Sequence, residues 1–228
     1  RTSKIPVDLI EKAKNEKKND EEVTSPYTKE NDKKIRVPKW IIVLGIAAYF
    51  LYQSFVVEPR EKRVQEELFA AQKYFEQEDF KKALEGDGKH AGLISLIEEY
   101  GSTKGGSLAN FYAGNIYLRQ GEYKKAIEHL SAYKGEDKIL AQQTKALIGD
   151  AYVELGQLDK AISNYKDAAK SNNVMTTPFI LLKLGQVYEM QKNNAEALNC
   201  YKRIKTEFPA SQEYREIEKY ISRLENLQ

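Results

Sequence analysis

The chain has few of the cysteine and histidine side chains that bind zinc or form disulfides. Cysteine occurs once, as Cys200, and histidine twice, as His90 and His129. A single cysteine excludes a disulfide within the chain, and these three side chains are too few for a typical zinc site. Cys200 lies beside Tyr201 in a helical pattern, which favours a small core residue over a reactive thiol. The sequence therefore predicts no metal and no cofactor.

The chain also lacks a strong bias toward one sign of charge. Lys and Arg total 36 and Asp and Glu total 34, which gives a formal net charge of +2. Domains that bind nucleic acid through its phosphates carry a marked basic excess. We therefore expect no direct, sequence-specific binding of nucleic acid.

Catalytic motifs are missing as well. The glycine-rich segments GDGKHAG at 86–92 and GSTKGG at 101–106 have the wrong order for phosphate-binding loops, so we interpret both as ordinary interhelical loops. Carboxylate pairs such as Glu66-Glu67 fit solvated helix faces, and no G-x-S-x-G motif occurs. An enzyme that uses carboxylates or a tyrosine-rich groove remains a third hypothesis, but the sequence predicts a protein without catalytic activity.

One long apolar run stands out, WIIVLGIAAYFLYQSFVV at 40–57, with 18 residues and no charge. As a helix it is about 27 Å long, which suits a bilayer, and Trp40 at its edge suits the headgroup region. A buried core helix is the alternative. The run starts about 40 residues into the sequence and is followed by Glu58-Pro59-Arg60, so we interpret it as an uncleaved anchor and not a signal peptide.

Basic residues near the run predict its orientation. Residues 29–39 contain five Lys or Arg and residues 58–68 contain three, which favours a cytoplasmic N-terminus with residues 58–228 on the far side of the membrane. In a bacterium the far side is the periplasm. The tail at 1–39 has eleven basic and eight acidic residues and short apolar patches, so we expect disorder unless a cytoplasmic partner docks on it.

A spacing of residues recurs after the span, with a period of 35 and then 36 residues between its glycines. Each copy has Gly, then Tyr at +3, Ala at +12 and a large residue at +16, which fits two short helices better than strands. The copies are Gly114, Tyr117, Ala126 and Leu130; Gly149, Tyr152, Ala161 and Tyr165; and Gly185, Tyr188, Ala197 and Tyr201. A weaker copy has Ala71, Tyr74 and Ala83.

The segments AGNIY, IGDAY and LGQVY, followed by KKAIEHL, DKAISNY and AEALNCY, resemble the tetratricopeptide repeat family over 107–209, and weakly over 64–84. The resemblance implies helix pairs in which the glycines admit a close approach, the alanines face them and the +3 tyrosines fill the space between. Gly121 and Gly156 suit the turns, with Asn193 and Asn194 in place of glycine in the last copy.

These patterns predict an all-α fold: a single transmembrane helix at 40–57, then a solenoid of about four helix pairs at 58–209 and a capping helix at 210–228. An insertion between Ala83 and Ser107 predicts an extra helix from about His90 to Tyr100. The cap is expected from a helical stripe of Tyr214, Ile217, Tyr220, Ile221 and Leu224.

The family resemblance also implies a concave groove lined by the first helix of each pair. Carried onto this sequence, its positions are Leu108, Phe111, Asn115, Leu118, Gln143, Ala146, Asp150, Val153, Phe179, Leu182, Gln186 and Glu189. Such a mixture of apolar and polar groups suits a peptide. Packing of Phe111 and Phe179 inside the solenoid or under the last helix is equally compatible with the sequence.

Some family members capture acidic chaperone C-termini with a clamp of Lys, Asn and Arg. Asn115 matches one clamp position and Lys183 approximates the arginine, but Phe111, Leu147 and Phe179 occupy the others. We therefore do not expect capture of a carboxylate by two hydrogen bonds.

The whole arrangement of tail, span and repeats resembles the YfgM family of ancillary proteins of the bacterial Sec translocon. That resemblance implies location in the inner membrane and association with SecYEG and a PpiD-like, membrane-anchored periplasmic chaperone. The alternative is an organellar import or fission receptor whose repeats face the cytosol. The ligand of the groove and the oligomeric state are left open by the sequence.

Overall fold

The computed structural model describes residues 39–226. Within that range the regular elements are all helices, with no strand. The all-α prediction is thus confirmed. By its internal contacts the chain divides between Leu51 and Tyr52 into two units, which are described in turn. The expectations for residues 1–38, disorder and a docking partner, concern residues outside the described range.

The first unit contains most of helix α2 (Lys39–Tyr52), whose apolar side chains point to the surface all around it. Trp40, Val43 and Phe50 are each more than 60% exposed. Helical backbone continues through five π-helical residues, Gln53–Val57, into α3 (Glu58–Glu76). This 37-residue helix from Trp40 is long and apolar enough to cross a membrane, by length and composition, and none of its most apolar window is buried.

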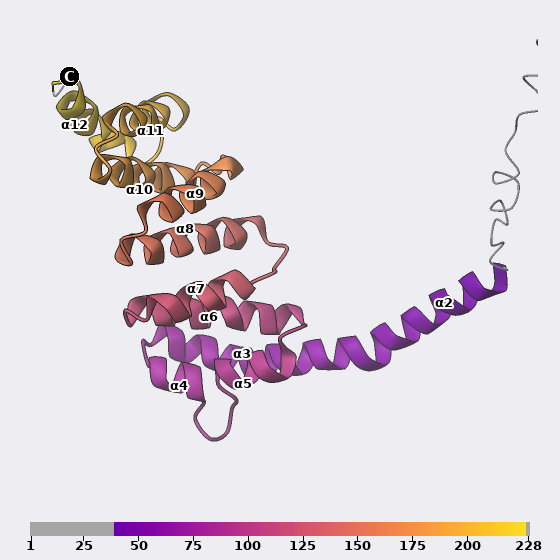
Figure 1. Cartoon of the computed structure of the whole chain (residues 1–228). Coiled ribbons are helices and arrows are strands. Elements are labelled where there is room, and N and C mark those ends of the chain that lie inside the picture. Colours follow the sequence, from indigo (N-terminus) through magenta and orange to yellow (C-terminus); the bar gives the residue numbers. More distant parts are fainter. Residues whose placement is uncertain (1–38, 227–228) are drawn as a thin grey trace, which may run out of the picture. The chain divides into compact units, whose positions relative to one another are not determined.

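The second unit is a stack of helix pairs (Figure 1). The three pairs that follow the sequence repeat are α6 (Lys104–Arg119) with α7 (Tyr123–Ala132), α8 (Lys138–Glu154) with α9 (Leu158–Ala168), and α10 (Thr177–Met190) with α11 (Asn194–Glu207). A short 3-10 turn, Ala169–Ser171, extends α9. The second helix of each pair also packs on the next helix along the chain, which makes the stack continuous.

Glycines let the two helices of each pair approach. A Cβ atom at Gly149 would lie 2.7 Å from Cε1 of Tyr165, and one at Gly185 would collide with the ring of Tyr201. Gly114 faces Leu130 in the same way. This is the close approach that the repeat predicts, and the large residue at +16 fills the space opposite the glycine.

The remaining repeat positions divide by burial. Ala126, Ala161 and Ala197 are fully buried, as expected from small residues between helices. Of the tyrosines that were expected to fill the interhelical space, Tyr188 is buried, whereas Tyr117 and Tyr152 are half-buried. Tyr117 and Tyr152 still pack against the core clusters, and a lysine ammonium lies 5.3 Å from the centroid of each ring.

The turn between the helices of a pair always places one residue in the left-handed region. Gly121 and Gly156 occupy it in two pairs, as predicted, with φ of +79° and +68°. In the last pair Lys192 occupies it, with φ of +60°, and not an asparagine. Asn193 instead caps α11, since its side chain accepts the backbone N–H of Glu196. Glu78 holds the matching position in the first pair.

The first pair consists of α3 and the short α4 (Phe80–Glu85), followed by the predicted extra helix, α5 (Leu93–Tyr100). Ala71 and Ala83 are buried, and Tyr74 donates a hydrogen bond of 2.8 Å to Asp87. The extra helix begins three residues later than predicted. Asp87 accepts the backbone N–H groups of Lys89 and His90, which holds those residues in a loop and lowers the pKa of Asp87.

The sequence predicted an interhelical loop for the segment GSTKGG at 101–106. Only its first part is a loop, because α6 already begins at Lys104. The Thr103 hydroxyl accepts the backbone N–H of Gly106 at 3.0 Å. From α3, Glu61 accepts the backbone N–H groups of Lys104 and Gly105 at 3.0 and 2.9 Å. A carboxylate at a helix N-terminus is favoured by the helix dipole, so these two acceptors fix where α6 starts.

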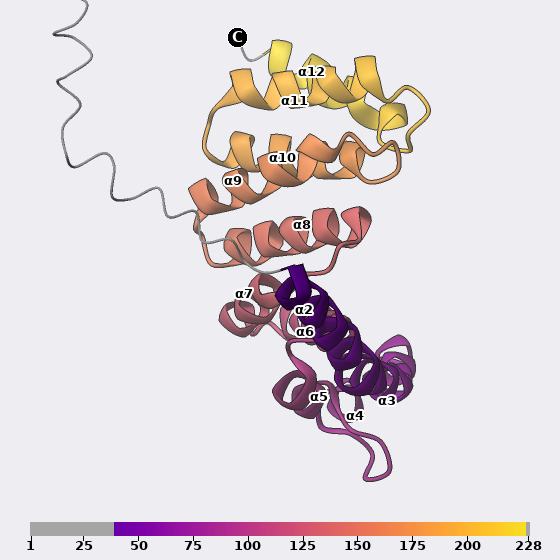
Figure 2. The same ribbon diagram turned by 90° about the vertical axis from the view of Figure 1, so that its right-hand side faces the viewer.

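The last described helix, α12 (Tyr214–Glu225), covers the end of the stack (Figure 2). Ile217, Ile221 and Leu224 are buried against α11, and the ring of Tyr220 lies 5.3 Å from that of Tyr201. Tyr214, also placed on the predicted stripe, is 39% exposed. The segment therefore forms a helix on the last pair, which is where a cap was predicted.

Candidate interaction groove

Two adjoining hollows lie along α6, α8 and α10. The first, of about 410 Å3, is here called the aromatic hollow and the second, of about 430 Å3, the polar hollow. Both are lined by Asp150 and Lys183, so together they form one groove. The structure brings nine predicted groove residues to it: Phe111, Asn115, Gln143, Ala146, Asp150 and Phe179 in the aromatic hollow, and Leu118, Val153 and Gln186 in the polar hollow, which Asp150 also lines.

The two phenylalanines of the aromatic hollow differ in exposure. Phe111 is 6% exposed and packs with Leu130 and Ile148, in line with the packing alternative. Phe179 is 48% exposed, and the ammonium of Lys183 lies 4.6 Å from its ring centroid. An exposed aromatic ring beside a cation offers a partner both apolar area and polar contact. Phe179 is thus the exposed phenylalanine of the aromatic hollow.

A network of polar groups crosses the centre of the groove. Lys183 donates to both carboxylate oxygens of Asp150, at 2.8 and 2.7 Å, and these two side chains are 26% and 23% exposed. The hydroxyl of Tyr165 donates to the same carboxylate at 2.5 Å. Burial and the nearby Asp150 raise the pKa of Tyr165, so it stays a neutral donor. Lys183, the approximate match to a clamp arginine, is therefore already paired.

Three predicted groove residues lie elsewhere and stabilise the fold. Leu108 and Leu182 are half-buried against core clusters. Glu189 accepts hydrogen bonds from the hydroxyl of Tyr201 and from Arg223 of α12. Sequence reasoning could not foresee the role of Glu189, because its partner Arg223 is 34 residues away, outside the repeats.

Several residues that line the groove were missed in the sequence, among them Met175 and Met190. Met175 is 84% exposed and borders the aromatic hollow from the loop before α10. The side chain of Asn173 accepts the backbone N–H groups of Met175 and Thr176, which holds this loop against the hollow. The available signal was two apolar residues, Val174 and Met175, in the middle of a polar loop.

The cysteine and the two histidines, which could act as nucleophile, base or metal ligand, lie apart from one another. Cys200 is buried, as predicted, and burial raises the pKa of its thiol to about 11. His129 is half-buried, its ring 3.0 Å from Asn110 Oδ1, whereas His90 lies near Glu67 on another part of the surface. Within residues 39–226 no group of three or more His, Cys, Asp or Glu residues could hold a metal ion. In the described part of the chain, the groove's geometry suits binding.

Comparison with known proteins gives the following matches. A tetratricopeptide repeat-like domain matches residues 60–189, more than half of the chain, and a tetratricopeptide repeat matches residues 180–211. No curated protein matches. Among solved structures, the crystal structure of BtubC (BKLC) from P. vanneervenii is similar with a TM-score of 0.44 and 14% identity. That alignment covers 72% of this chain and 66% of that one, slightly less than two thirds of its length.

Proposed function

This chain belongs to the tetratricopeptide repeat-like domain family, and from that premise we propose that it is a membrane-anchored scaffold that binds protein segments in its groove. Domains of this family are typically non-enzymatic modules for protein interaction. The long apolar helix with exposed side chains supports the anchor, since lipid would cover them.

The observation that carries the binding role is the pairing of exposed apolar and amide groups along the groove. Phe179 and Met175 are exposed apolar side chains at its rim. Asn115, Gln143 and Gln186 line the same groove with side-chain amides, which can both donate to and accept from a peptide backbone. An extended segment with apolar side chains is the ligand that such a surface fits.

We propose further that the protein acts at the bacterial Sec translocon, with the repeats in the periplasm. Support comes from the five basic residues before the span against three after it, and from the resemblance of the whole arrangement to the YfgM family. The partners would be SecYEG and a PpiD-like chaperone, which the scaffold would bring to newly translocated proteins. A receptor with cytosol-facing repeats is the alternative.

The groove is tested by affinity purification of the full chain from membranes after cross-linking. We expect Phe179→Asp to reduce recovery of SecY and the periplasmic chaperone at least about tenfold, because a charge replaces an apolar anchor. Ile139→Asp is the matched control, since Ile139 is likewise 48% exposed but lines neither hollow. Equal recovery with both variants would show that the groove is not the binding surface.

Orientation is tested by digesting intact cells and permeabilised cells with protease. Residues 58–228 should be cleaved only after the outer membrane is opened, and a reporter fused after Gln228 should be active in the periplasm. Protection of the repeats by the inner membrane would overturn the periplasmic assignment and favour the cytosol-facing receptor.

A further inference from the structure

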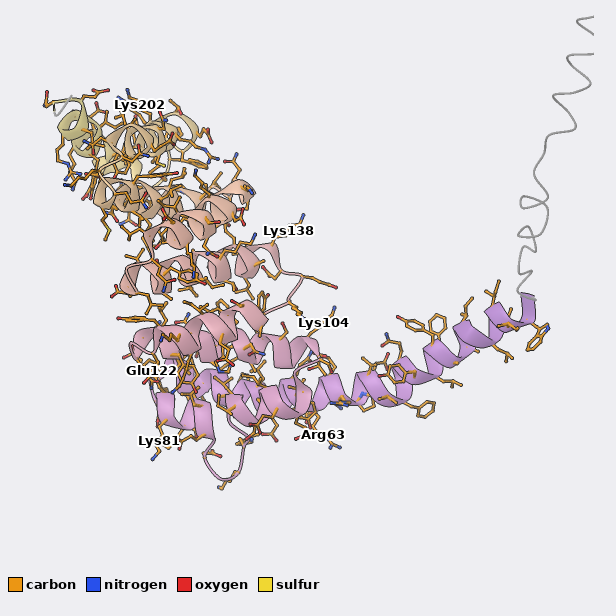
Figure 3. The ribbon with its side chains drawn as sticks, in the orientation of Figure 1. Arg63, Lys81, Lys104, Glu122, Lys138 and Lys202 are labelled. Atoms are coloured by element: carbon orange, nitrogen blue, oxygen red, sulfur yellow. The ribbon has the colours of Figure 1, made fainter. Side chains whose placement is uncertain are left out.

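A third hollow, of about 420 Å3, lies where the uncharged run ends. Phe55 and Val56, near the end of that run, line it together with Pro59, Arg60, Arg63, Glu99 and Tyr100. It is here called the anchor hollow. One side of its lining is apolar, and the other carries two guanidinium groups from the first turns of α3. Figure 3 labels Arg63 on this part of α3.

The spacing of these residues places them on one helix face. Val56, Arg60 and Arg63 follow one another at intervals of four and three, which aligns side chains along a helix. The π-helical residues Gln53–Val57 lie directly before α3. A π-helical turn has more residues than an α-helical turn, so it resets which side chains of the run face the same way as the arginines.

Residues at the end of α5 form the opposite wall of the anchor hollow. Arg60 donates a hydrogen bond of 2.7 Å to the backbone carbonyl of Glu99, and its guanidinium carbon lies 5.8 Å from the centre of the Tyr100 ring. The neighbouring Glu99 carboxylate raises the pKa of Tyr100, while Arg63 opposes that shift. Arg60, Arg63, Glu99 and Tyr100 therefore lie within reach of one another.

The charges of this hollow leave a positive excess. Arg60 and Arg63 face the one carboxylate of the lining, Glu99, so the lining carries one net positive charge. Glu61 on the same helix is engaged by the backbone of α6 and is not part of the lining. A guanidinium has five N–H donors, so Arg60 keeps donors after binding the Glu99 carbonyl. A ligand with a single negative charge would balance the hollow.

We propose that the anchor hollow binds the headgroup of a singly anionic phospholipid, with its phosphate at Arg60 and Arg63 and its acyl side against Phe55 and Val56. This rests on the proposed membrane anchor: with residues 40–57 in the bilayer, residues 55–63 lie at its boundary, where phospholipid phosphates are found. Arginine forks match phosphate oxygens. A zwitterionic lipid would leave the excess charge of the hollow unbalanced.

The test uses the full chain, purified in an uncharged detergent and titrated with short-chain lipids while binding is measured by thermophoresis. Dioctanoyl phosphatidylglycerol should bind at least about tenfold more tightly than dioctanoyl phosphatidylcholine. The reason is that phosphatidylcholine has no net negative charge to pair with the positive excess of the hollow. Glycerophosphoglycerol, the same headgroup without acyl chains, should bind at least about tenfold more weakly than the lipid. Equal binding of both lipids overturns the proposal. Equal binding with and without acyl chains indicates a site for a free phosphate and also overturns it.

Variants identify the site. Arg63→Gln should weaken binding of dioctanoyl phosphatidylglycerol at least about fivefold, because it removes one guanidinium from the lining. Lys62→Gln is the matched control: it makes the same change of charge next door, but Lys62 is not in the lining, so binding should change less than about twofold. A loss as large in Lys62→Gln as in Arg63→Gln would indicate attraction by general surface charge and overturn the site.

Failure of the lipid site can be told apart from failure of the anchor. Carbonate extraction of membranes tests the anchor alone, and wild type, Arg63→Gln and Lys62→Gln should all remain in the membrane. Extraction of the wild-type chain would refute the anchor and, with it, the proposed site. Retention of all three proteins together with unselective lipid binding would refute the site alone. Arg60→Gln is less decisive, because it also breaks the bond to Glu99 that joins α3 to α5.

Discussion

At the scale of single residues, each pair from α6 to α11 depends on the absence of one side chain. Gly114, Gly149 and Gly185 have no Cβ atom, and the space is taken by Leu130, Tyr165 or Tyr201 from the second helix. A glycine inside a helix costs roughly 1 kcal/mol relative to alanine, so its presence here needs a compensating contact. The fully buried large side chain opposite provides it.

Gly185→Ala should therefore destabilise the protein by about 1–3 kcal/mol, although alanine favours helix, because the new methyl group collides with the ring of Tyr201. Urea unfolding followed by circular dichroism measures the change. The control is the same substitution in a Tyr201→Ala background, where the ring is gone and the substitution should be neutral or stabilising. A cost that is the same in both backgrounds would show that the ring is not the cause.

At the scale of elements, helix boundaries in the first part of the stack are set by groups from other helices. Glu61 of α3 accepts two backbone N–H groups at the start of α6, and Glu67 of the same helix accepts the backbone N–H of Ala91 at 3.0 Å. Helix α3 thus fixes the loop before α5 and the first turn of α6 with two carboxylates six residues apart. The insertion is held in place by these bonds as well as by its apolar contacts.

Glu61→Ala should lower the free energy of unfolding by about 1–2 kcal/mol, a cost like that of losing an N-cap, because the first N–H groups of α6 lose their acceptor although Thr103 remains. Hydrogen exchange should show the loss locally, as faster exchange of the Lys104 and Gly105 amides. Glu66→Ala is the control, since Glu66 is exposed on the same helix, and we expect a change within about 0.5 kcal/mol. Unchanged exchange at Lys104 and Gly105 in Glu61→Ala would contradict this role.

At the scale of the whole repeat unit, the last helix pair has an apolar surface with no further pair to cover it. The surface under α12 is formed by Tyr201 and Ile204 of α11 and by Phe208, which follows that helix; all three are buried, as are the side chains that join the inner pairs. Without a cover it would be an apolar patch able to accept another helix. Helix α12 covers it with three aliphatic side chains and turns its charged face outward.

Ile221→Asp should destabilise the stack by at least about 3 kcal/mol, because it places an unpaired charge among buried side chains, and should promote self-association as the cap detaches. Ser222→Asp introduces the same charge at the exposed neighbouring position and should leave both properties nearly unchanged. Size-exclusion chromatography of the full chain in detergent, together with urea unfolding, measures the two effects. A monomeric Ile221→Asp protein of normal stability would refute the capping role.

Sequence reasoning succeeded where the determining contacts are local and recur. Gly149, Ala161 and Tyr165 lie within one helix pair, so their spacing reflects their packing directly. It failed where a residue has two suitable places. Asn193 tolerates left-handed backbone and also caps helices, and only the fold shows that it caps α11 while Lys192 takes the turn.

The groove was predictable for a different reason, and to a smaller extent. Asn115, Gln143 and Phe179 lie where the family positions put them, because the stacking of helix pairs is common to the family. Glu189 is drawn away by Arg223, which lies beyond the repeats, and Met175 comes from a loop that the repeat pattern does not describe. Contacts that depend on a loop or a cap have no periodic signal in the sequence.

In the ion pair between Lys183 and Asp150, the Asp150 carboxylate competes with any acidic ligand for Lys183. An acidic peptide that sought Lys183 would have to displace Asp150, leaving that carboxylate and the Tyr165 hydroxyl to find new partners in a partly buried site. A neutral, apolar segment meets no such barrier, because it can lie on Phe179 with the pair intact. Under the proposed function, selectivity in this groove arises from rejection of the wrong charge at least as much as from attraction of the right side chain.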